Sequence, residues 1–196
     1  ARAGARFDRR VVLFAHIDTR PDTPGATDNA GGVAALLCLA ELLAGYRGDL
    51  GIELVAMNGE DYYGASGEKM FLAENEGRMG EIVLGVNADG IAYRGGEDAF
   101  SLYHCPDDLA TTVRAAFARY PGLVEGGPWY AGDHGLFLRG GVPAVALTSS
   151  KVDELLAGYT HTPRDTVELV DPQKIVTVSL ALFDLIERLA VATSGA

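Results

Sequence analysis

The chain has 196 residues, of which 48% are hydrophobic and 22% charged, a composition typical of a globular protein that buries a full core in one domain. Its formal net charge of −11 argues against nucleic acid or an anionic membrane surface as a partner. We find no apolar run of transmembrane length and no signal peptide, so we expect a soluble protein, and the sequence does not indicate its compartment.

Two features of the chain carry little information about its surroundings. The sequence begins at Ala1 without a methionine, so we expect its N-terminus to have been processed or trimmed. Cys38 lies in an apolar run and is expected to be a small core residue, and a disulfide with Cys105 is not favoured.

Short apolar runs alternate with helical patterns along the whole chain. Apolar, partly β-branched runs predict buried strands, which we place at residues 11–15, 52–57, 82–86, 100–103 and 142–147. Apolar spacing and capping signals predict helices, which we place at residues 29–44, 64–76, 107–120, 133–139 and 172–191. The last helix has the clearest start, with Asp171 as N-cap and Pro172 at the first helical position. We expect residues 121–132 to form a Gly/Pro loop and residues 151–159 to be mobile.

Strands that alternate with helices predict an α/β fold with a mainly parallel sheet covered on both faces. In such sheets, ligands bind beyond the carboxyl ends of the strands. We find no internal repeat and no domain boundary, so residues 1–196 are treated as one domain.

Acidic and imidazole side chains follow several of these apolar runs. They are His16, Asp18, Asp28, Glu60, Asp61, Asp89 and His161. Each has an ordinary interpretation by itself: Asp28 fits a helix N-cap, the His16–Asp18 pair fits the end of a strand, and Glu60 with Asp61 fits a surface turn. Because His16 and Asp18 are two positions apart, we expect the Asp18 carboxylate to reach the His16 imidazole and fix its tautomer.

Taken together, the two histidines and three of the aspartates form a ligand set suited to zinc, although cobalt or manganese would also be accepted. The set is His16, Asp28, Asp61, Asp89 and His161. If Asp28 bridges, two ions ~3.5–4 Å apart could be held. Glu60, beside a ligand, could then take a proton from a metal-activated water as a general base.

The order of five motifs resembles the co-catalytic di-zinc aminopeptidases of clan MH, of the bacterial leucyl aminopeptidase type. The motifs are His16-x-Asp18, Pro24-Gly25-Ala26-Thr27-Asp28-Asn29-Ala30-Gly31-Gly32, Asn58-Gly59-Glu60-Asp61, Asn87-Ala88-Asp89 and His161-Thr162-Pro163-Arg164-Asp165-Thr166, with Gly132-Asp133-His134-x-x-Phe137 as a further piece. The resemblance runs from about residue 11 to the final helix.

This resemblance implies a three-layer α/β/α sandwich and an enzyme that removes N-terminal residues from peptides with two zinc ions. One ion would be held by His16, Asp28 and Asp89. The other would be held by Asp28, Asp61 and His161. Glu60 would be the base, and a cis peptide bond would follow Asp28.

Three departures and some open points accompany the resemblance. Many relatives carry Glu where this chain has Asp61, and relatives usually begin with additional strands. The tyrosine that stabilises the developing oxyanion in the family has two candidates here, Tyr159 and Tyr130, neither in the expected register. The pocket that selects the terminal residue is expected among Tyr62-Tyr63, Trp129 and Tyr159, and the oligomeric state is not indicated.

Three other functions remain open at this point. A carboxypeptidase or deacylase of the same clan usually inserts a separate domain, for which residues 89–161 are too short. A glutaminyl cyclase-like acyl transfer would use one zinc ion. A catalytically inert binding module would usually have lost a ligand or the base, and all six positions are occupied here.

Overall fold

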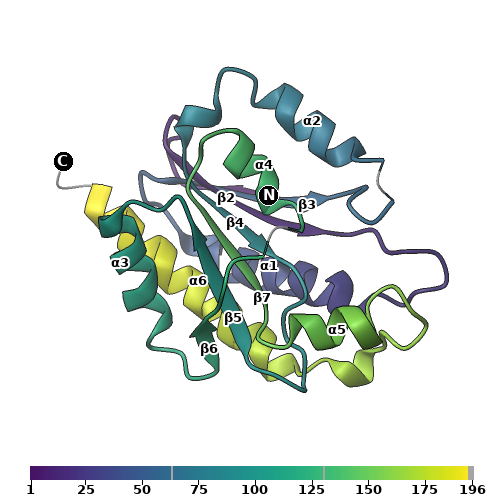
Figure 1. Ribbon diagram of the computed structural model, residues 1–196. Coiled ribbons are helices and arrows are strands. Elements are labelled where there is room, and N and C mark those ends of the chain that lie inside the picture. The colour runs from purple at the N-terminus through teal and green to yellow at the C-terminus, as the bar shows by residue number, and fades with distance from the viewer. Residues whose placement is uncertain (63, 130, 194–196) are drawn as a thin grey trace.

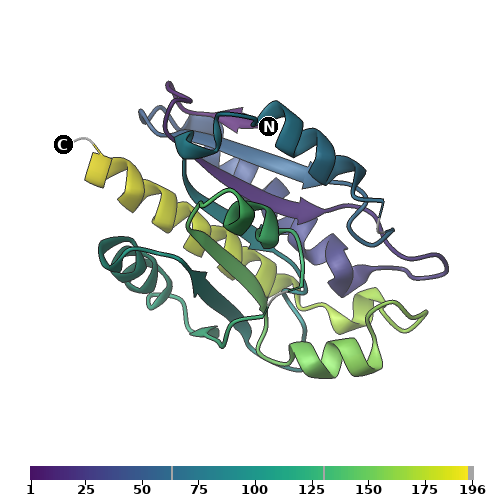
Figure 2. The same ribbon diagram turned by 45° about the horizontal axis from the view of Figure 1, so that its top comes forward.

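The structure, a computed structural model, describes residues 1–62, 64–129 and 131–193, and its strands form a sheet between two helical layers (Figures 1 and 2). The strands are β1 (Arg2–Ala3), β2 (Arg10–His16), β3 (Gly51–Met57), β4 (Ile82–Ala88), β5 (Asp98–Tyr103), β6 (Leu123–Glu125) and β7 (Ala144–Ser149). The helices are α1 (Gly31–Leu42), α2 (Ser66–Glu74), α3 (Asp107–Phe117), α4 (His134–Arg139), α5 (Val152–Gly158) and α6 (Pro172–Thr193). Short turns lie at Ala26–Ala30, Leu43–Gly45, Met79–Glu81 and Val167–Leu169.

The sheet is mixed but parallel at its centre. The strand order is β1-β3-β2-β4-β7-β5-β6, in which β3, β2, β4 and β7 are mutually parallel. Strand β1 is antiparallel to β3, β5 is antiparallel to β7, and β6 is parallel to β5. Every residue of β2 is buried, as expected for a strand covered on both faces. The four central strands therefore bring their carboxyl ends to one edge.

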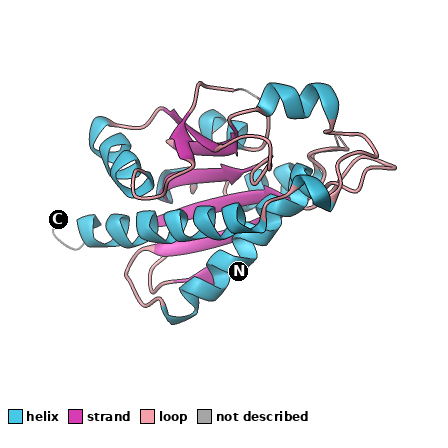
Figure 3. Ribbon diagram, turned by 90° about the horizontal axis from the view of Figure 1, so that it is seen from below, coloured by secondary structure: helices cyan, strands magenta, loops and turns pink. Residues whose placement is uncertain are grey.

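Two separate cores hold the helices on the sheet. Helices α1, α3 and α6 cover one face, and Figure 3 shows α6 running across it. Helices α2 and α4 cover the other face. Successive residues of β2 serve opposite cores, because Leu13 packs with the first group while Phe14 stacks on Phe137 of α4 at 4.4 Å between ring centroids. The predicted three-layer α/β/α sandwich is confirmed.

The structure corrects several predicted elements. Residues 151–159, expected to be mobile, contain helix α5. The helix is held in place because Leu155 is buried and Tyr93 Oη donates a hydrogen bond to Glu154 at 2.6 Å. Strand β1 was not predicted, and β6 lies within the expected loop at residues 121–132. Cys38 is only half-buried rather than a core residue, and both cysteines are free, as expected.

The start of α6 is confirmed in detail. Asp171 Oδ1 accepts a hydrogen bond from the backbone N–H of Gln173 at 3.0 Å, which is the contact of an N-cap. Pro172 is the first helical residue, as predicted.

By length and composition one described helical stretch, Ala26–Gly45, could cross a membrane, contrary to our expectation that no run was long enough. The stretch contains α1, whose Ala35 and Leu39 are fully buried. Ser179 of α6 donates a hydrogen bond to the carbonyl of Ala35 at 3.2 Å. Because the core helix of a globular protein passes the same test, this stretch is weak evidence for a span.

Candidate metal centre

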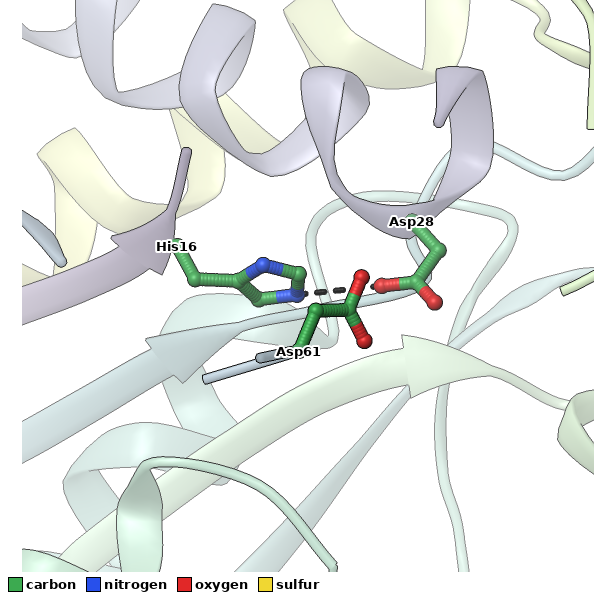
Figure 4. A group of neighbouring side chains, drawn as sticks. All are labelled: His16, Asp28 and Asp61. Atoms are coloured by element: carbon green, nitrogen blue, oxygen red, sulfur yellow. Dashed lines mark ion pairs between the residues drawn. The ribbon is translucent and has the colours of Figure 1, made fainter. Parts of the chain in front are cut away.

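The predicted ligands come from the edge where the parallel strands end. His16 is the last residue of β2, and Asp89 follows β4 directly. Asp28 lies in the turn that leads from β2 into α1, and Asp61 follows β3 after a short turn. His161 follows α5 with a positive φ of 61°. Figure 4 shows the side chains of His16, Asp28 and Asp61 converging from three different segments.

The distances divide these side chains into two groups around Asp28. Its Oδ1 lies 3.0 Å from His16 Nε2, which is also 3.4 Å from Asp89 Oδ1. Its Oδ2 lies 3.2 Å from His161 Nε2, which is also 2.8 Å from Asp61 Oδ1. The structure therefore brings together all five predicted ligands, with the two oxygens of Asp28 facing different histidines.

This cluster requires positive charge. Burial by itself lowers the pKa of His16, but the carboxylates of Asp28 and Asp89 outweigh it and raise that pKa to about 12. Burial, followed by the charge of Asp28, also raises the pKa of Asp61. Among the described residues, neither His16 Nε2 nor Asp61 Oδ2 has an aligned hydrogen-bond partner. Buried imidazole and carboxylate atoms left in this state fit a zinc ion, which is bound by such donors.

Glu60 shares a cavity with the cluster. The cavity has a volume of about 190 Å³, and its walls include Glu60, Asp61, Asp89 and His161. Burial, followed by the charge of Asp89, raises the pKa of Glu60 to about 8. The remainder of the wall is mostly apolar and comes from the segment around Trp129 and from α5.

The chain resembles known proteins over most of its length. The sequence model of peptidase family M28 matches residues 1–186. The chain belongs to this family. A curated relative, aminopeptidase YwaD of Bacillus subtilis (strain 168), is 23% identical over 175 residues, which cover 84% of this chain and 38% of that protein.

Solved structures of the same fold include a zinc aminopeptidase and a glutaminyl cyclase. A zinc aminopeptidase from Bacillus subtilis superposes with a TM-score of 0.76 at 20% identity, covering 91% of this chain and 45% of that one. A glutaminyl cyclase from Fimbriiglobus ruber superposes with a TM-score of 0.77 at 19% identity, covering 92% of this chain and 71% of that one. The present chain thus spans less than half the length of these aminopeptidase relatives.

Asp18 supports this M28 centre differently from our expectation. The nearest group to His16 Nδ1 is the backbone carbonyl of Asp18 at 3.0 Å, whereas the carboxylate is 3.9 Å away. Because a carbonyl only accepts, Nδ1 carries the proton and Nε2 is left for a ligand. The Asp18 carboxylate instead accepts hydrogen bonds from the backbone N–H groups of Gly59 at 2.7 Å and Asp61 at 3.0 Å. It therefore holds the turn that carries Glu60.

The aromatic candidates are only partly placed at the M28 centre. Trp129 lines the cavity, as expected for this loop. The ring of Tyr159 lies 6.0 Å from that of Tyr93 and 5.5 Å from the Arg164 guanidinium, and the structure does not bring it into the cavity wall. Tyr130 and Tyr63 lie outside the described residues. Tyr62 is exposed and is not part of the wall either.

Two buried aspartates near the centre were not given a role from sequence. Burial, partly offset by His16, raises the pKa of Asp133 to about 7, and neither carboxylate oxygen has a hydrogen-bond partner among the described residues. Asp165 is fully buried and contacts the turn that carries Asp28. Both lie in motifs of the M28 resemblance, which was the available signal, but the motif alone does not say what the carboxylates contact.

Proposed function

We propose that this chain is the catalytic unit of a zinc-dependent aminopeptidase. The observation that carries the proposal is the position of Asp28, whose two carboxylate oxygens lie 3.0 Å and 3.2 Å from two different histidines. Membership of peptidase family M28 supports hydrolysis of peptide bonds. The relatives are named an aminopeptidase and a zinc aminopeptidase, which supports zinc as the metal and cleavage at the N-terminal end of a peptide.

Two zinc ions would be held by this chain's own side chains. His16 and Asp89 would hold one ion and Asp61 and His161 the other, with Asp28 shared between them. Bound there, zinc lowers the pKa of water from about 15.7 to about 7 and polarises a substrate carbonyl. The buried His16 and Asp61 contribute fixed positions, because the carbonyl of Asp18 accepts a hydrogen bond from the His16 ring and the carboxylate of Asp18 accepts one from the backbone N–H of Asp61.

Glu60 would be the general base. It takes the proton from the water whose oxygen bonds to the peptide carbonyl carbon, and it gives that proton to the amine nitrogen as the C–N bond breaks. The cavity position of Glu60 beside Asp89 and Asp61 supports this role.

The charge of the cavity favours an aminopeptidase over a carboxypeptidase. Among the described residues that line it, there are carboxylates and His161 but no lysine or arginine. The described part of this wall therefore offers no cationic side chain to pair with the terminal carboxylate that a carboxypeptidase must recognise. Residues 89–161 also contribute strands β5, β6 and β7 to the sheet rather than a separate inserted domain.

The test combines metal analysis with a conservative variant. We expect purified protein reconstituted with zinc to hold two ions per chain and to hydrolyse aminoacyl anilides but not their N-acetylated forms. Glu60→Gln should lower kcat by about 10²–10⁴-fold while zinc content stays the same. One ion per chain with cyclisation of N-terminal glutamine would favour the cyclase-like alternative, and no zinc affinity would favour the inert module.

A further inference from the structure

The Asp165 side chain accepts hydrogen bonds from the turn that carries Asp28, the ligand proposed to be shared by two ions. Its Oδ1 accepts hydrogen bonds from the backbone N–H of Thr27 at 2.8 Å and from the Thr27 hydroxyl at 2.7 Å. Its Oδ2 accepts a hydrogen bond from the backbone N–H of Asp28 at 3.0 Å. The backbone carbonyl of Asp165 accepts a further hydrogen bond from Ala26 N–H at 3.2 Å. Three consecutive residues before α1 are thus held by one residue more than 130 positions away in the sequence.

Hydrogen bonds on both sides of Asp28 connect its turn to the segments of His161 and Asp89. Asp165 lies four residues after His161, so it ties the Asp28 turn to the segment of one histidine. On the other side, Asn29 Nδ2 donates a hydrogen bond to the carbonyl of Ala88 at 2.8 Å, next to Asp89. Asp28 is therefore held through both of its sequence neighbours. Thr27 is bonded to the segment of His161, and Asn29 is bonded to the residue before Asp89.

The chemistry of the contact suits positioning rather than ligation. All three partners of the Asp165 carboxylate are neutral N–H or O–H groups, and the residue is fully buried. Hydrogen bonds to an ionised acceptor are about twice as strong as neutral ones, and both oxygens are used on one short segment. A change at Asp165 would therefore move the Asp28 carboxylate without removing any ligand atom.

We infer that Asp165 is a positioning residue that sets the Asp28 carboxylate so that its two oxygens serve two metal ions at once. This inference rests on the proposed two-zinc function. Because Asp28 is shared, loss of Asp165 weakens the binding of both ions together, even though Asp165 touches neither. Residues that orient metal ligands typically change metal affinity by about 10–100-fold when they are substituted.

The experiment measures zinc affinity of the full chain after chelation, by titration with Zn²⁺ against a competing chelator. Asp165→Asn places an amide N–H against backbone N–H donors and removes the charge. Thr27→Val is the milder variant, which loses only the hydroxyl contact. Leu185→Ala is the stability control, since Leu185 is buried about 20 Å along the axis of α6 from Pro172. Visible absorption of the Co²⁺-loaded variants reports the ligand geometry independently of activity.

We expect Asp165→Asn to weaken both zinc equivalents about 10–100-fold and to change the Co²⁺ spectrum, and Thr27→Val to weaken both by a smaller factor. Leu185→Ala should lower the unfolding midpoint and leave zinc affinity unchanged. Wild-type affinity in Asp165→Asn would overturn the inference, and so would an equal loss in Leu185→Ala or a loss confined to one equivalent. In each of those cases the proposed function would stand, whereas a wild-type chain that binds no zinc would overturn both.

Discussion

Asp98, at the start of β5, offers a quantitative test of how burial acts on a charge in this fold. Its side chain is 2% exposed, and Oδ1 accepts a hydrogen bond from the backbone N–H of Ala92 at 2.6 Å. Burial raises the pKa of Asp98 from 3.8 to about 6, although the Ala92 hydrogen bond and the charge of Lys174 act in the opposite direction. We consider the substitution Asp98→Asn, which keeps an oxygen for Ala92 N–H and never ionises.

The sign and size of the effect follow from that pKa. The unfolded chain loses the Asp98 proton near pH 3.8 and the folded chain near pH 6, so stability falls as the pH rises through this window. A rise of about two pKa units, at 1.36 kcal/mol each, corresponds to about 3 kcal/mol. Asp98→Asn should therefore be more stable than the parent by up to about 3 kcal/mol above pH 6, and the difference should shrink toward pH 4.

Urea unfolding of parent and variant at pH 5, 6, 7 and 8 measures this difference. A chelator in every sample removes any contribution from bound cations. Asp49→Asn, at an exposed position, serves as the control for the change in net charge. A difference that stays constant between pH 5 and 8, or a variant less stable than the parent at pH 8, would refute the reasoning.

Two further substitutions test the core and the Asp28 turn. Phe137→Ala should lower the free energy of unfolding by about 3–5 kcal/mol in urea, because the ring is fully buried and stacks on Phe14, and a loss below about 1 kcal/mol would contradict this packing. Gly25→Ala should lower both zinc affinity and the melting temperature, because Gly25 has φ of 69° and a Cβ there would overlap the Thr19 methyl group. Gly45→Ala is its control, since a Cβ there meets nothing within 4 Å, and equal effects at both glycines would count against a specific role for Gly25.

The fold was predictable wherever one strong local pattern decided an element. The uninterrupted apolar run of β2 and the Asp171-Pro172 signal of α6 each point to one structure, and the structure confirms both. Helix α5 was missed because its sequence is short and lies among polar loops, where tertiary contacts such as the one between Tyr93 and Glu154 stabilise a helix that local sequence does not predict. Strand β1 spans two residues and depends on pairing with β3, which no local pattern encodes.

The cluster of candidate ligands was predictable from the sequence, but the hydrogen bonds of the residues that support it were not. Chemistry restricts which residues can bind zinc, and the ends of parallel strands restrict where they meet, so the five candidate ligands that the structure brings together could be named. A supporting carboxylate has no such restriction, because any backbone N–H can be its partner. Asp18 was expected at His16 and instead holds Gly59 and Asp61. The cis peptide bond between Asp28 and Asn29, expected only from the family resemblance, is present.

Two kinds of buried carboxylate meet at this edge of the sheet. One kind is hydrogen-bonded to backbone N–H groups, and the other has an oxygen without such a partner. Asp18 and Asp165 are satisfied by backbone N–H groups, so they fix the segments around them whether or not a cation is bound. Asp61, in contrast, keeps an unpartnered oxygen and a raised pKa, so its burial becomes favourable only near positive charge. A cation that binds the folded chain but not the unfolded chain adds RT ln(1 + [L]/Kd) to the free energy of unfolding. This amounts to about 4 kcal/mol when the free cation concentration is a thousand times Kd. The geometry of the centre is thus set by the chain, while a bound cation would supply part of the free energy that keeps it folded.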